Sequence, residues 1–194
     1  MSGRVWFTSD LHLGNLHVAS TRGFDADDSS VGRHDLAIKR NWNEVVRPSD
    51  TVWVLGDVCL DARNLPKVAE LNGTKHLITG NHDAVFPGRH NSHKFYKIWS
   101  EYFASIQPFA VRHYDGTKFL LSHFPYSGDR EAGTERCSQF RLKDEGLPLV
   151  HGHLHMPHVL HPAWPRQVHV GLDAWELRPV PLGEVVRLVR EVSK

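Results

Sequence analysis

The chain has 194 residues, of which 40% are hydrophobic and 23% charged, and its formal net charge is +1 with histidine neutral. These values fit a soluble globular protein with one sizeable core, and we treat residues 1–194 as a single domain. No run of five or six like charges occurs, so nucleic acid is not the favoured partner. The two cysteines, Cys59 and Cys137, form no CxxC pair, which predicts free thiols in a reducing compartment.

The first ten residues, MSGRVWFTSD, lack the apolar stretch of a secretory signal. Nowhere does the sequence approach the ~18 consecutive apolar residues of a membrane span. We therefore expect a cytoplasmic protein with no membrane contact, and the sequence indicates no particular oligomeric state. The most unusual total is 15 histidines, five of which fall in the segment LVHGHLHMPHVLH at 149–161.

Hydrophobic periodicity predicts strands alternating with helices, followed by a hairpin. Strands are expected at 5–9, 51–55, 75–79, 106–114, 117–124, 147–155 and 166–175. Helices are expected at 32–46, 64–73, 92–103 and 182–192. The hairpin turn is predicted at Asp115-Gly116, a dipeptide that favours tight turns. This order predicts an α/β fold with a mixed sheet.

Polar residues follow five of the predicted strands. They are Asp10 and His12, then Asp57, then Asn81, His82 and Asp83, then His123, and finally His153 and His155. In open α/β sheets, sites form outside the carboxyl ends of the strands, so these ends are expected to converge. Glycines adjoin several of these positions, at Gly56, Gly80 and Gly152, and permit sharp turns and close approach.

The set combines oxygen and nitrogen ligands without a thiolate, which suits Mn²⁺, Fe or Zn²⁺ rather than a structural zinc site. It exceeds the needs of one tetrahedral ion, whereas two ions that share a carboxylate would use all of it. A two-metal site clamps the attacking and leaving oxygens of a displacement reaction.

The ordered motifs resemble those of the calcineurin-like metallophosphoesterase superfamily. They are D-x-H at 10–12, G-D at 56–57, G-N-H-D at 80–83, S-H at 122–123 and G-H-x-H at 152–155. The stretches VWFTSDLHLG and SHFPY are more similar to the small bacterial and phage phosphoesterases than to the large protein phosphatases. The resemblance implies two mixed β-sheets packed face to face and flanked by helices, a four-layer sandwich.

The resemblance also implies roles for individual residues. One metal would be held by Asp10, His12 and His155, and the other by Asn81, His123 and His153, with Asp57 as the bridge. A hydroxide held by the metals would attack phosphorus in line. His82 would be catalytic, as general acid or as a stabiliser of charge on the phosphoryl group, and Asp83 would orient it. Two divalent ions are expected, with Mn²⁺ favoured over Fe, Zn²⁺ or Ni²⁺.

The chain also departs from the family pattern. Asn15 stands where related small members often have histidine, and His17 is the candidate to substitute for that histidine. The stretch GDVCLDAR, which begins at Gly56, does not match the GDxxDRG pattern of the protein serine/threonine phosphatases. A clamp for a phosphomonoester dianion is not evident either; the candidates are Arg22, Arg130, Arg136 and Arg141. Cys59 is expected to be packed rather than catalytic.

We therefore expect a metal-dependent phosphodiesterase that acts on small, nucleotide-like phosphodiesters such as cyclic nucleotides. The alternatives are a phosphomonoesterase, a nuclease of the same superfamily and, more remotely, a binding scaffold that has lost catalysis. A metallo-β-lactamase fold is disfavoured because it requires an early HxHxDH motif, whereas the alternating histidines His151, His153 and His155 come late in this chain.

Overall fold

The computed structural model describes residues 3–25, 27–131 and 134–193, with the side chains of residues 28, 130 and 131 left out. The first sheet has the strand order β11-β1-β2-β3-β4. Its strands are β1 Val5–Thr8, β2 Thr51–Val54, β3 Thr74–Ile78, β4 Ser105–Gln107 and β11 Val180–Pro181. β1 to β4 are parallel and β11 is antiparallel, so the sheet is mixed.

The second sheet has the order β10-β9-β6-β5. Its strands are β5 Phe109–Tyr114, β6 Thr117–Ser122, β9 Leu149–His151 and β10 Gln167–His169. The predicted hairpin is β5 and β6, and its turn residues Asp115 and Gly116 have φ of 49° and 70°, as a two-residue hairpin turn requires. A separate ribbon pairs β7 Arg130–Glu131 with β8 Thr134–Glu135.

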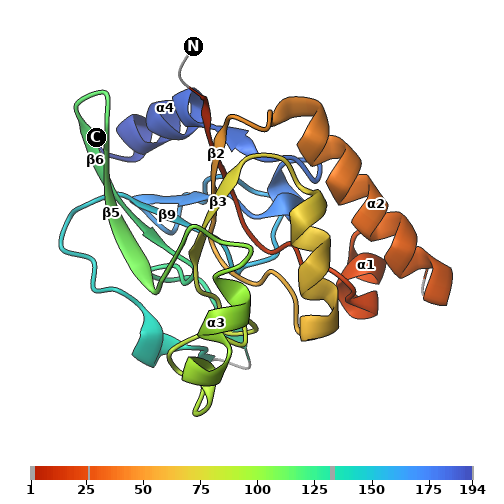
Figure 1. The fold of residues 1–194 in the computed structure, drawn as a ribbon. Coiled ribbons are helices and arrows are strands. Elements are labelled where there is room, and N and C mark those ends of the chain that lie inside the picture. The colour runs from red at the N-terminus through yellow and green to blue at the C-terminus, as the bar shows by residue number, and fades with distance from the viewer. Residues whose placement is uncertain (1–2, 26, 132–133, 194) are drawn as a thin grey trace.

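The helices lie along the outside of the sheets and at one end (Figure 1). The α-helices are α1 Leu16–Thr21, α2 Asp28–Val45, α3 Tyr96–Trp99 and α4 Leu182–Val192. The 3₁₀ helices are η1 Ala62–Glu70, η2 Ser92–Lys94, η3 Ser138–Phe140 and η4 Leu172–Ala174. In the described part of the chain, no helix is both long and apolar enough to cross a bilayer.

Two of the predicted helices differ from expectation. The segment predicted at 64–73 is the 3₁₀ helix η1, with Pro66 inside it, because proline cannot donate the hydrogen bond of a regular α-helix. The helix predicted near 92–103 shrinks to the short elements η2 and α3. Strands β7, β8 and β11 and helix α1 were not predicted, because each is too short to show a clear hydrophobic period. The strand predicted at 106–114 is two strands, β4 and β5, which belong to different sheets. The strand predicted at 166–175 is shorter, since β10 ends at His169 and residues 172–174 form η4.

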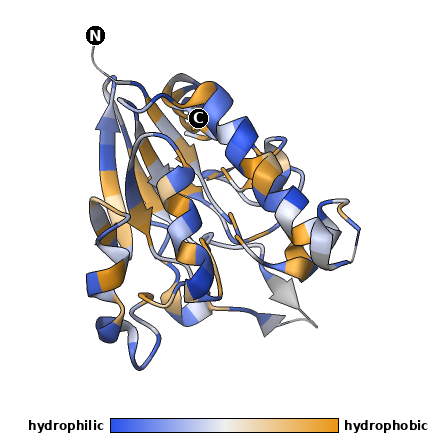
Figure 2. Cartoon of the chain, turned by 45° about the vertical axis from the view of Figure 1, so that its right-hand side comes forward, coloured by the Kyte–Doolittle hydropathy of each residue, from blue (hydrophilic) through white to orange (hydrophobic). Residues whose placement is uncertain are grey.

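Side chains of the first sheet alternate between two cores, as the period of two in a strand requires. Trp6 and Val52 face a core that also contains Trp42 of α2 and Leu65 of η1. Phe7 and Trp53 face the second core, which lies between the sheets. That inter-sheet core is built with Phe119, Leu121, Val150 and Val168 of the second sheet and Val185, Val186, Leu188 and Val189 of α4. In Figure 2 the strands carry long hydrophobic stretches, whereas helical segments alternate between hydrophobic and hydrophilic.

The predicted fold class, two mixed sheets packed face to face with flanking helices, is confirmed. Because β1, β2 and β3 are parallel, their carboxyl ends lie at one edge of the first sheet. β6 and β9 are parallel in the second sheet, so their carboxyl ends also share an edge. The five segments that carry the candidate ligands follow these five strands.

Candidate metal centre and its surroundings

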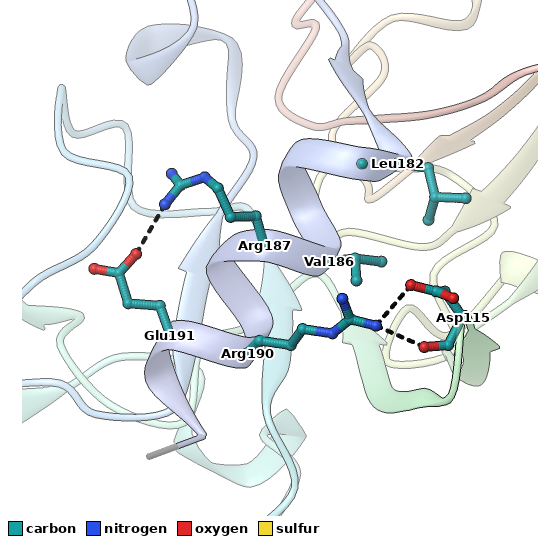
Figure 3. A pocket seen from close by; sticks show the side chains of 7 residues that line it. Asp115, Leu182, Val186, Arg187, Arg190 and Glu191 are labelled. Carbon is teal, nitrogen blue, oxygen red and sulfur yellow. Dashed lines mark hydrogen bonds and ion pairs between the residues drawn. The ribbon is translucent and has the colours of Figure 1, made fainter.

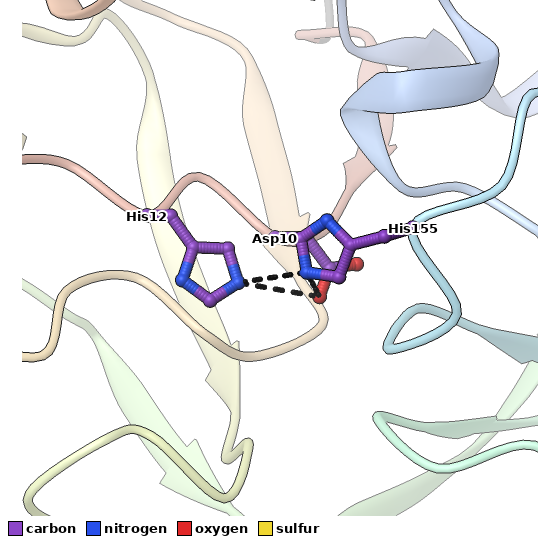
Figure 4. Close-up of side chains that lie close together, drawn as sticks. All are labelled: Asp10, His12 and His155. Carbon is purple, nitrogen blue, oxygen red and sulfur yellow. Dashed lines mark hydrogen bonds and ion pairs between the residues drawn. The ribbon is translucent and has the colours of Figure 1, made fainter. Parts of the chain in front are cut away.

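Asp10, His12 and His155 form the first group of side chains at the sheet ends (Figure 4). The Nε2 atoms of His12 and His155 lie 3.0 Å apart. Asp10 Oδ1 lies 4.0 Å from His12 Nε2 and 3.8 Å from His155 Nε2. Two imidazole nitrogens and one carboxylate oxygen therefore converge on a single point.

Asp57, His123 and His153 form the second group. His123 Nε2 lies 3.4 Å from Asp57 Oδ2 and 3.2 Å from His153 Nδ1. The amide oxygen Oδ1 of Asn81 lies 3.2 Å from the same His123 nitrogen. This second group therefore gathers the four remaining candidate ligands.

A single carboxylate oxygen lies between the two groups. Asp57 Oδ2 is 3.6 Å from His12 Nε2 in the first group and 3.4 Å from His123 Nε2 in the second. The main chain holds Asp57 in place, since its Oδ1 accepts a hydrogen bond of 2.9 Å from the amide of His82. All seven predicted ligands thus lie in two adjoining groups that meet at Asp57.

Five of these seven residues have left-handed backbone conformations. The φ angles are 60° at Asp10, 47° at His12, 54° at Asp57, 73° at His153 and 46° at His155. Such conformations cost non-glycine residues roughly 1–2 kcal/mol each and persist only where the surroundings impose them. They turn the chain sharply at the strand ends and aim the side chains inward.

Glycines allow the close packing behind the site. A Cβ atom on Gly80 would lie 2.3 Å from Asp57 Oδ1, and one on Gly152 would lie 2.6 Å from Asp10 Oδ2. Of the three glycines expected beside the ligands, Gly56 has a positive φ, of 89°. Gly80 and Gly152 are therefore required for space rather than for backbone angle.

The electrostatics of the two groups favour a cation. Burial lowers the pKa of His12 and of His153 to about 4, so both rings are neutral and able to act as ligands. Burial also lowers the pKa of His123, but the nearby carboxylates Asp57 and Asp10 outweigh this and raise it to about 9. The carboxylates of Asp57 and Asp10 therefore stabilise a positive charge at the His123 ring. A bound metal ion would supply that charge in place of the proton. The donor set and its geometry fit divalent ions bound by nitrogen and oxygen.

Comparison with known proteins decides the family. Residues 4–172 match the calcineurin-like phosphoesterase superfamily domain. This chain belongs to the calcineurin-like phosphoesterase superfamily. It is 40% identical to the Gene 66 protein of Mycobacterium phage D29 over 98% of both chains. It is 38% identical to the Gene 66 protein of Mycobacterium phage L5 over 98% of this chain and 96% of that protein.

A solved structure shares the fold. The crystal structure of a protein of unknown function from Aquifex aeolicus matches with a TM-score of 0.67 and 22% identity. The match covers 96% of this chain and 99% of the other. The buried histidines and aspartates of this chain are consistent with a metal site typical of the superfamily to which it belongs.

His82 lies at the rim of the candidate metal centre. Its side chain is 44% exposed, and its Nε2 atom lies 4.0 Å from Asp57 Oδ2. Its ring centroid is 5.6 Å from that of His12. His82 is therefore open to solvent on one side and to the candidate metal ligands on the other.

Asp83 was expected to orient the His82 ring, but its carboxylate contacts the main chain instead. Its carboxylate accepts hydrogen bonds from the main-chain amides of Asp57 at 3.1 Å, Val58 at 2.8 Å and Gly80 at 2.8 Å. Burial and the charge of Asp57 raise the pKa of Asp83 to about 7. Because the turn of GNHD directs the carboxylate toward these main-chain amides, Asp83 stabilises the conformation of the loop that carries Asp57.

Two aspartates near the metal ligands were not predicted from the sequence. Asp173 Oδ2 lies 3.2 Å from His155 Nδ1 and also accepts a bond of 2.8 Å from Arg22. Asp129 Oδ2 lies 2.7 Å from His153 Nε2. Each carboxylate contacts the ring nitrogen that faces away from the candidate metal. Contacts of this kind fix the tautomer and orientation of metal-ligating histidines.

The side chains considered as substitutes or clamps have other partners. Asn15 caps α1 by accepting a hydrogen bond of 3.1 Å from the amide of Val18, and His17 is exposed on that helix. The side chain of Arg22 is 4% exposed and donates to the main-chain oxygen of Asp10 at 2.7 Å as well as to Asp173. Burial raises the pKa of the Cys59 thiol to about 12, which suits a packed side chain.

The remaining candidate arginines lie around Asp129. Arg136 donates to Asp129 Oδ1 at 2.9 Å, and Arg141 pairs with Glu135 and donates to the main-chain oxygen of Asp129 at 3.3 Å. The side chain of Arg130 lies outside the described part of the structure. Arg89, which was not considered from the sequence, is exposed and donates to the main-chain oxygen of Asn81 at 3.3 Å.

One cavity borders the site, with a volume of about 430 Å³ and a lining that includes Arg22, His155 and Asp173. Another of about 280 Å³ is mostly apolar and is lined by Phe86, Phe124 and Phe140 but by none of the candidate ligands. A cavity of about 750 Å³ lies on α4 and the β5–β6 turn, where Arg187 and Arg190 already pair with carboxylates (Figure 3). None of its lining residues belongs to the candidate metal centre.

Proposed function

We propose that this protein is a binuclear metal-dependent phosphodiesterase that hydrolyses small phosphodiesters such as cyclic nucleotides. The observation that carries the proposal is the position of Asp57 Oδ2, 3.6 Å from His12 and 3.4 Å from His123. A carboxylate between two ligand groups suits a bridge between two ions.

The ligand assignment follows the two groups of side chains. Asp10, His12 and His155 would hold one ion, and Asn81, His123 and His153 the other, with Asp57 shared. Nitrogen and oxygen ligands without a thiolate suit Mn²⁺, with Fe, Zn²⁺ or Ni²⁺ as alternatives. Bound ions would activate water and stabilise the negative charge that develops on the phosphoryl oxygens.

Side chains at the rim would act on the substrate directly. The exposed ring of His82 is placed to donate a proton to the leaving oxygen, or to stabilise charge there. Arg89 presents a guanidinium beside Asn81 that can pair with a phosphoryl oxygen. Asp83 and Asp173 are positioning residues, since each acts on the loop or ring that carries a ligand.

A preference for diesters is supported by charge. A phosphomonoester dianion carries more charge than a diester and is typically bound by paired cationic groups. Arg22 and Arg136 each donate to a carboxylate of the protein. Arg89 is exposed and donates to the main-chain oxygen of the candidate ligand Asn81, so its guanidinium is accessible to a substrate. The apolar cavity beside Phe124 and Phe140 supports a leaving group with an aromatic or nucleobase part.

The test is a paired hydrolysis assay on protein that has been stripped with a chelator and reloaded with Mn²⁺. Bis(p-nitrophenyl) phosphate, p-nitrophenyl phosphate and 2′,3′- and 3′,5′-cyclic nucleotides are compared under the same conditions. Preferential cleavage of diesters, absent in Asp57→Asn, supports the proposal. Faster monoester cleavage would replace it by a phosphomonoesterase, and bound metal without turnover of any substrate would contradict it.

A further inference from the structure

A third group of potential ligands lies next to His153. Asp129, Cys137 and His153 each offer one ligand atom, and these atoms all lie within 4.8 Å of one another. They come from separate segments, before β7, before η3 and after β9. Asp129 and His153 are buried, and Cys137 is half-buried. A buried imidazole, a carboxylate and a thiol therefore meet beside the candidate metal centre.

His153 connects this group to the metal centre because its two ring nitrogens face different partners. Nδ1 lies 3.2 Å from His123 Nε2, on the side of the proposed catalytic ion. Nε2 lies 2.7 Å from Asp129 Oδ2, on the side of Cys137. A change of the group bound to Nε2 therefore alters the orientation and basicity of the same imidazole ring whose Nδ1 faces the proposed catalytic ion.

We propose that Asp129, Cys137 and His153 form a third cation site, one that takes a thiophilic divalent ion such as Zn²⁺ and inhibits the enzyme. The inhibitory effect rests on the proposed function, whereas the binding site itself does not. The ligand types are those of zinc sites, in which thiolate sulfur, imidazole nitrogen and carboxylate oxygen combine.

The ion would take the place of the proton between His153 Nε2 and Asp129 Oδ2. Two ligand bonds of about 2.0 Å at a tetrahedral angle require about 3.3 Å between these atoms, against the 2.7 Å of the hydrogen bond. The required widening is small. The Cys137 thiol and the His153 N–H that the ion replaces would each release one proton to solvent.

Arg136 determines which cations the third site accepts. Its guanidinium donates to Asp129 Oδ1 at 2.9 Å and that of Arg141 lies 3.8 Å from Asp129 Oδ2, so the only carboxylate in the group already has two positive charges beside it. Mg²⁺ and Ca²⁺ depend on several charged oxygen ligands and would gain little here. A thiolate-preferring ion gains most of its affinity from Cys137 instead.

Occupation of the third site would weaken catalysis through His153. The hydrogen bond from Nε2 to Asp129 orients the ring and increases the basicity of Nδ1, and the added ion would remove it. Loss of such a partner typically reduces metal affinity or activity about 10–100-fold. Excess Zn²⁺ is therefore expected to inhibit the Mn²⁺-loaded protein about tenfold or more.

The experiment uses Co²⁺ as a spectroscopic probe on the full-length Mn²⁺-loaded protein. A near-ultraviolet thiolate-to-cobalt charge-transfer band reports sulfur ligation, and the proposed catalytic ligands contain no sulfur. The band should saturate at one equivalent, disappear in Cys137→Ser and persist in Cys59→Ala. Circular dichroism and the melting temperature of each variant check that the fold is retained. Bound Zn²⁺ is counted alongside, with one ion fewer expected in Cys137→Ser.

Each outcome decides one part of the proposal. Absence of the band in the wild-type protein, or its persistence in Cys137→Ser, would overturn the site whether or not the protein has activity. If the site is present, Zn²⁺ should inhibit diester hydrolysis in the wild type but much less in Cys137→Ser. Equal inhibition of both proteins would overturn the inhibitory role. A band without any turnover would contradict the proposed function and leave the cation site supported.

Discussion

The Nδ1 atom of His155 lies 3.2 Å from a carboxylate oxygen of Asp173, and Arg22 holds that carboxylate from the other side with bonds of 3.0 and 2.8 Å. Burial alone would raise the pKa of Asp173. The hydrogen bonds from His155 and Arg22 outweigh burial and hold this pKa well below its ordinary value, so the carboxylate stays ionised. The contact leaves His155 Nε2 directed at Asp10 and His12. Asp173 therefore orients the candidate ligand His155 without being one of the candidate ligands itself.

Asp173→Asn is expected to weaken metal binding at one of two sites. The amide can present its NH₂ group to His155 Nδ1, which would favour the wrong tautomer of the ring. We expect about 10–100-fold weaker affinity for one Mn²⁺ ion and little change for the other, measured by calorimetric titration. Glu184→Gln, which alters an exposed pair with Arg187, is the matched control. Two unchanged affinities would show that the contact does not orient the ligand.

His82→Ala is expected to retain both metals and to lose turnover. The ring is 44% exposed and its Nε2 atom lies 4.0 Å from Asp57 Oδ2, so it faces solvent beside the candidate ligands rather than lying among them. Loss of a general acid typically reduces kcat about 10²–10⁴-fold. Metal content by mass spectrometry and kcat for a diester are measured together. His17→Ala, on the exposed face of α1, is the control, and normal turnover of His82→Ala would refute the assigned role.

Arg89→Ala is expected to increase KM for a diester several-fold while both metals remain bound. The guanidinium is exposed and reaches the main chain of Asn81, so it is available to a phosphoryl oxygen. A charge-assisted hydrogen bond contributes about 1.5–3 kcal/mol, which corresponds to roughly 10–100-fold in affinity at most. Arg63→Ala, exposed and paired with Asp61, provides the comparison. An unchanged KM would remove Arg89 from the substrate site.

Asp50, which precedes β2 at the end opposite the candidate metal centre, is expected to make a pH-dependent contribution to the free energy of unfolding. Its buried carboxylate accepts hydrogen bonds from the amides of Arg4 and Arg47 and from the indole of Trp6. Burial raises the pKa of Asp50, but these hydrogen bonds outweigh burial and lower it below its ordinary value. A depressed pKa in the folded state gives stability that is present above about pH 4 and is lost as the pH falls through the folded-state pKa.

We therefore expect Asp50→Asn to lower the free energy of unfolding by about 1.5–3 kcal/mol at pH 7. The difference from the wild type should shrink as the pH falls from about 4, where the unfolded chain becomes protonated, toward the lower pKa of Asp50 in the folded state. Urea unfolding at both pH values measures it, and Asp61→Asn, on the exposed pair with Arg63, should change stability by less than about 0.5 kcal/mol. A difference that stays constant with pH would contradict this explanation.

Much of the fold and of the ligand arrangement could be predicted because the informative residues follow strands. Asp10, Asp57 and His123 each end an apolar run, and parallel strands bring such ends to one edge. The order of the motifs then indicated the family. The hairpin turn at Asp115-Gly116 was predictable for a local reason, since this dipeptide adopts the left-handed angles that the turn requires.

The supporting residues could not be predicted, because their role depends on contacts between distant segments. Asp173 is one aspartate in the segment GLDAW, and only the fold places it between His155 and Arg22. Asp129 lies between the predicted strands at 117–124 and 147–155, in a stretch for which no element was predicted. The surroundings of Asp83 depend on a turn that directs its carboxylate toward main-chain amides. The left-handed backbone at the ligands could not be predicted because only a few per cent of non-glycine residues adopt it, even though aspartate and histidine do so more often than most.

The most direct test of the central claim is metal counting combined with reactivation. The protein is stripped with a chelator, titrated with Mn²⁺, and assayed for bound ions and for hydrolysis of bis(p-nitrophenyl) phosphate at each step. We predict two bound ions per chain, activity that increases to its maximum only as the second ion binds, and loss of both binding and activity in Asp57→Asn. Full activity with one ion, or in the stripped protein, would contradict the binuclear site built around Asp57.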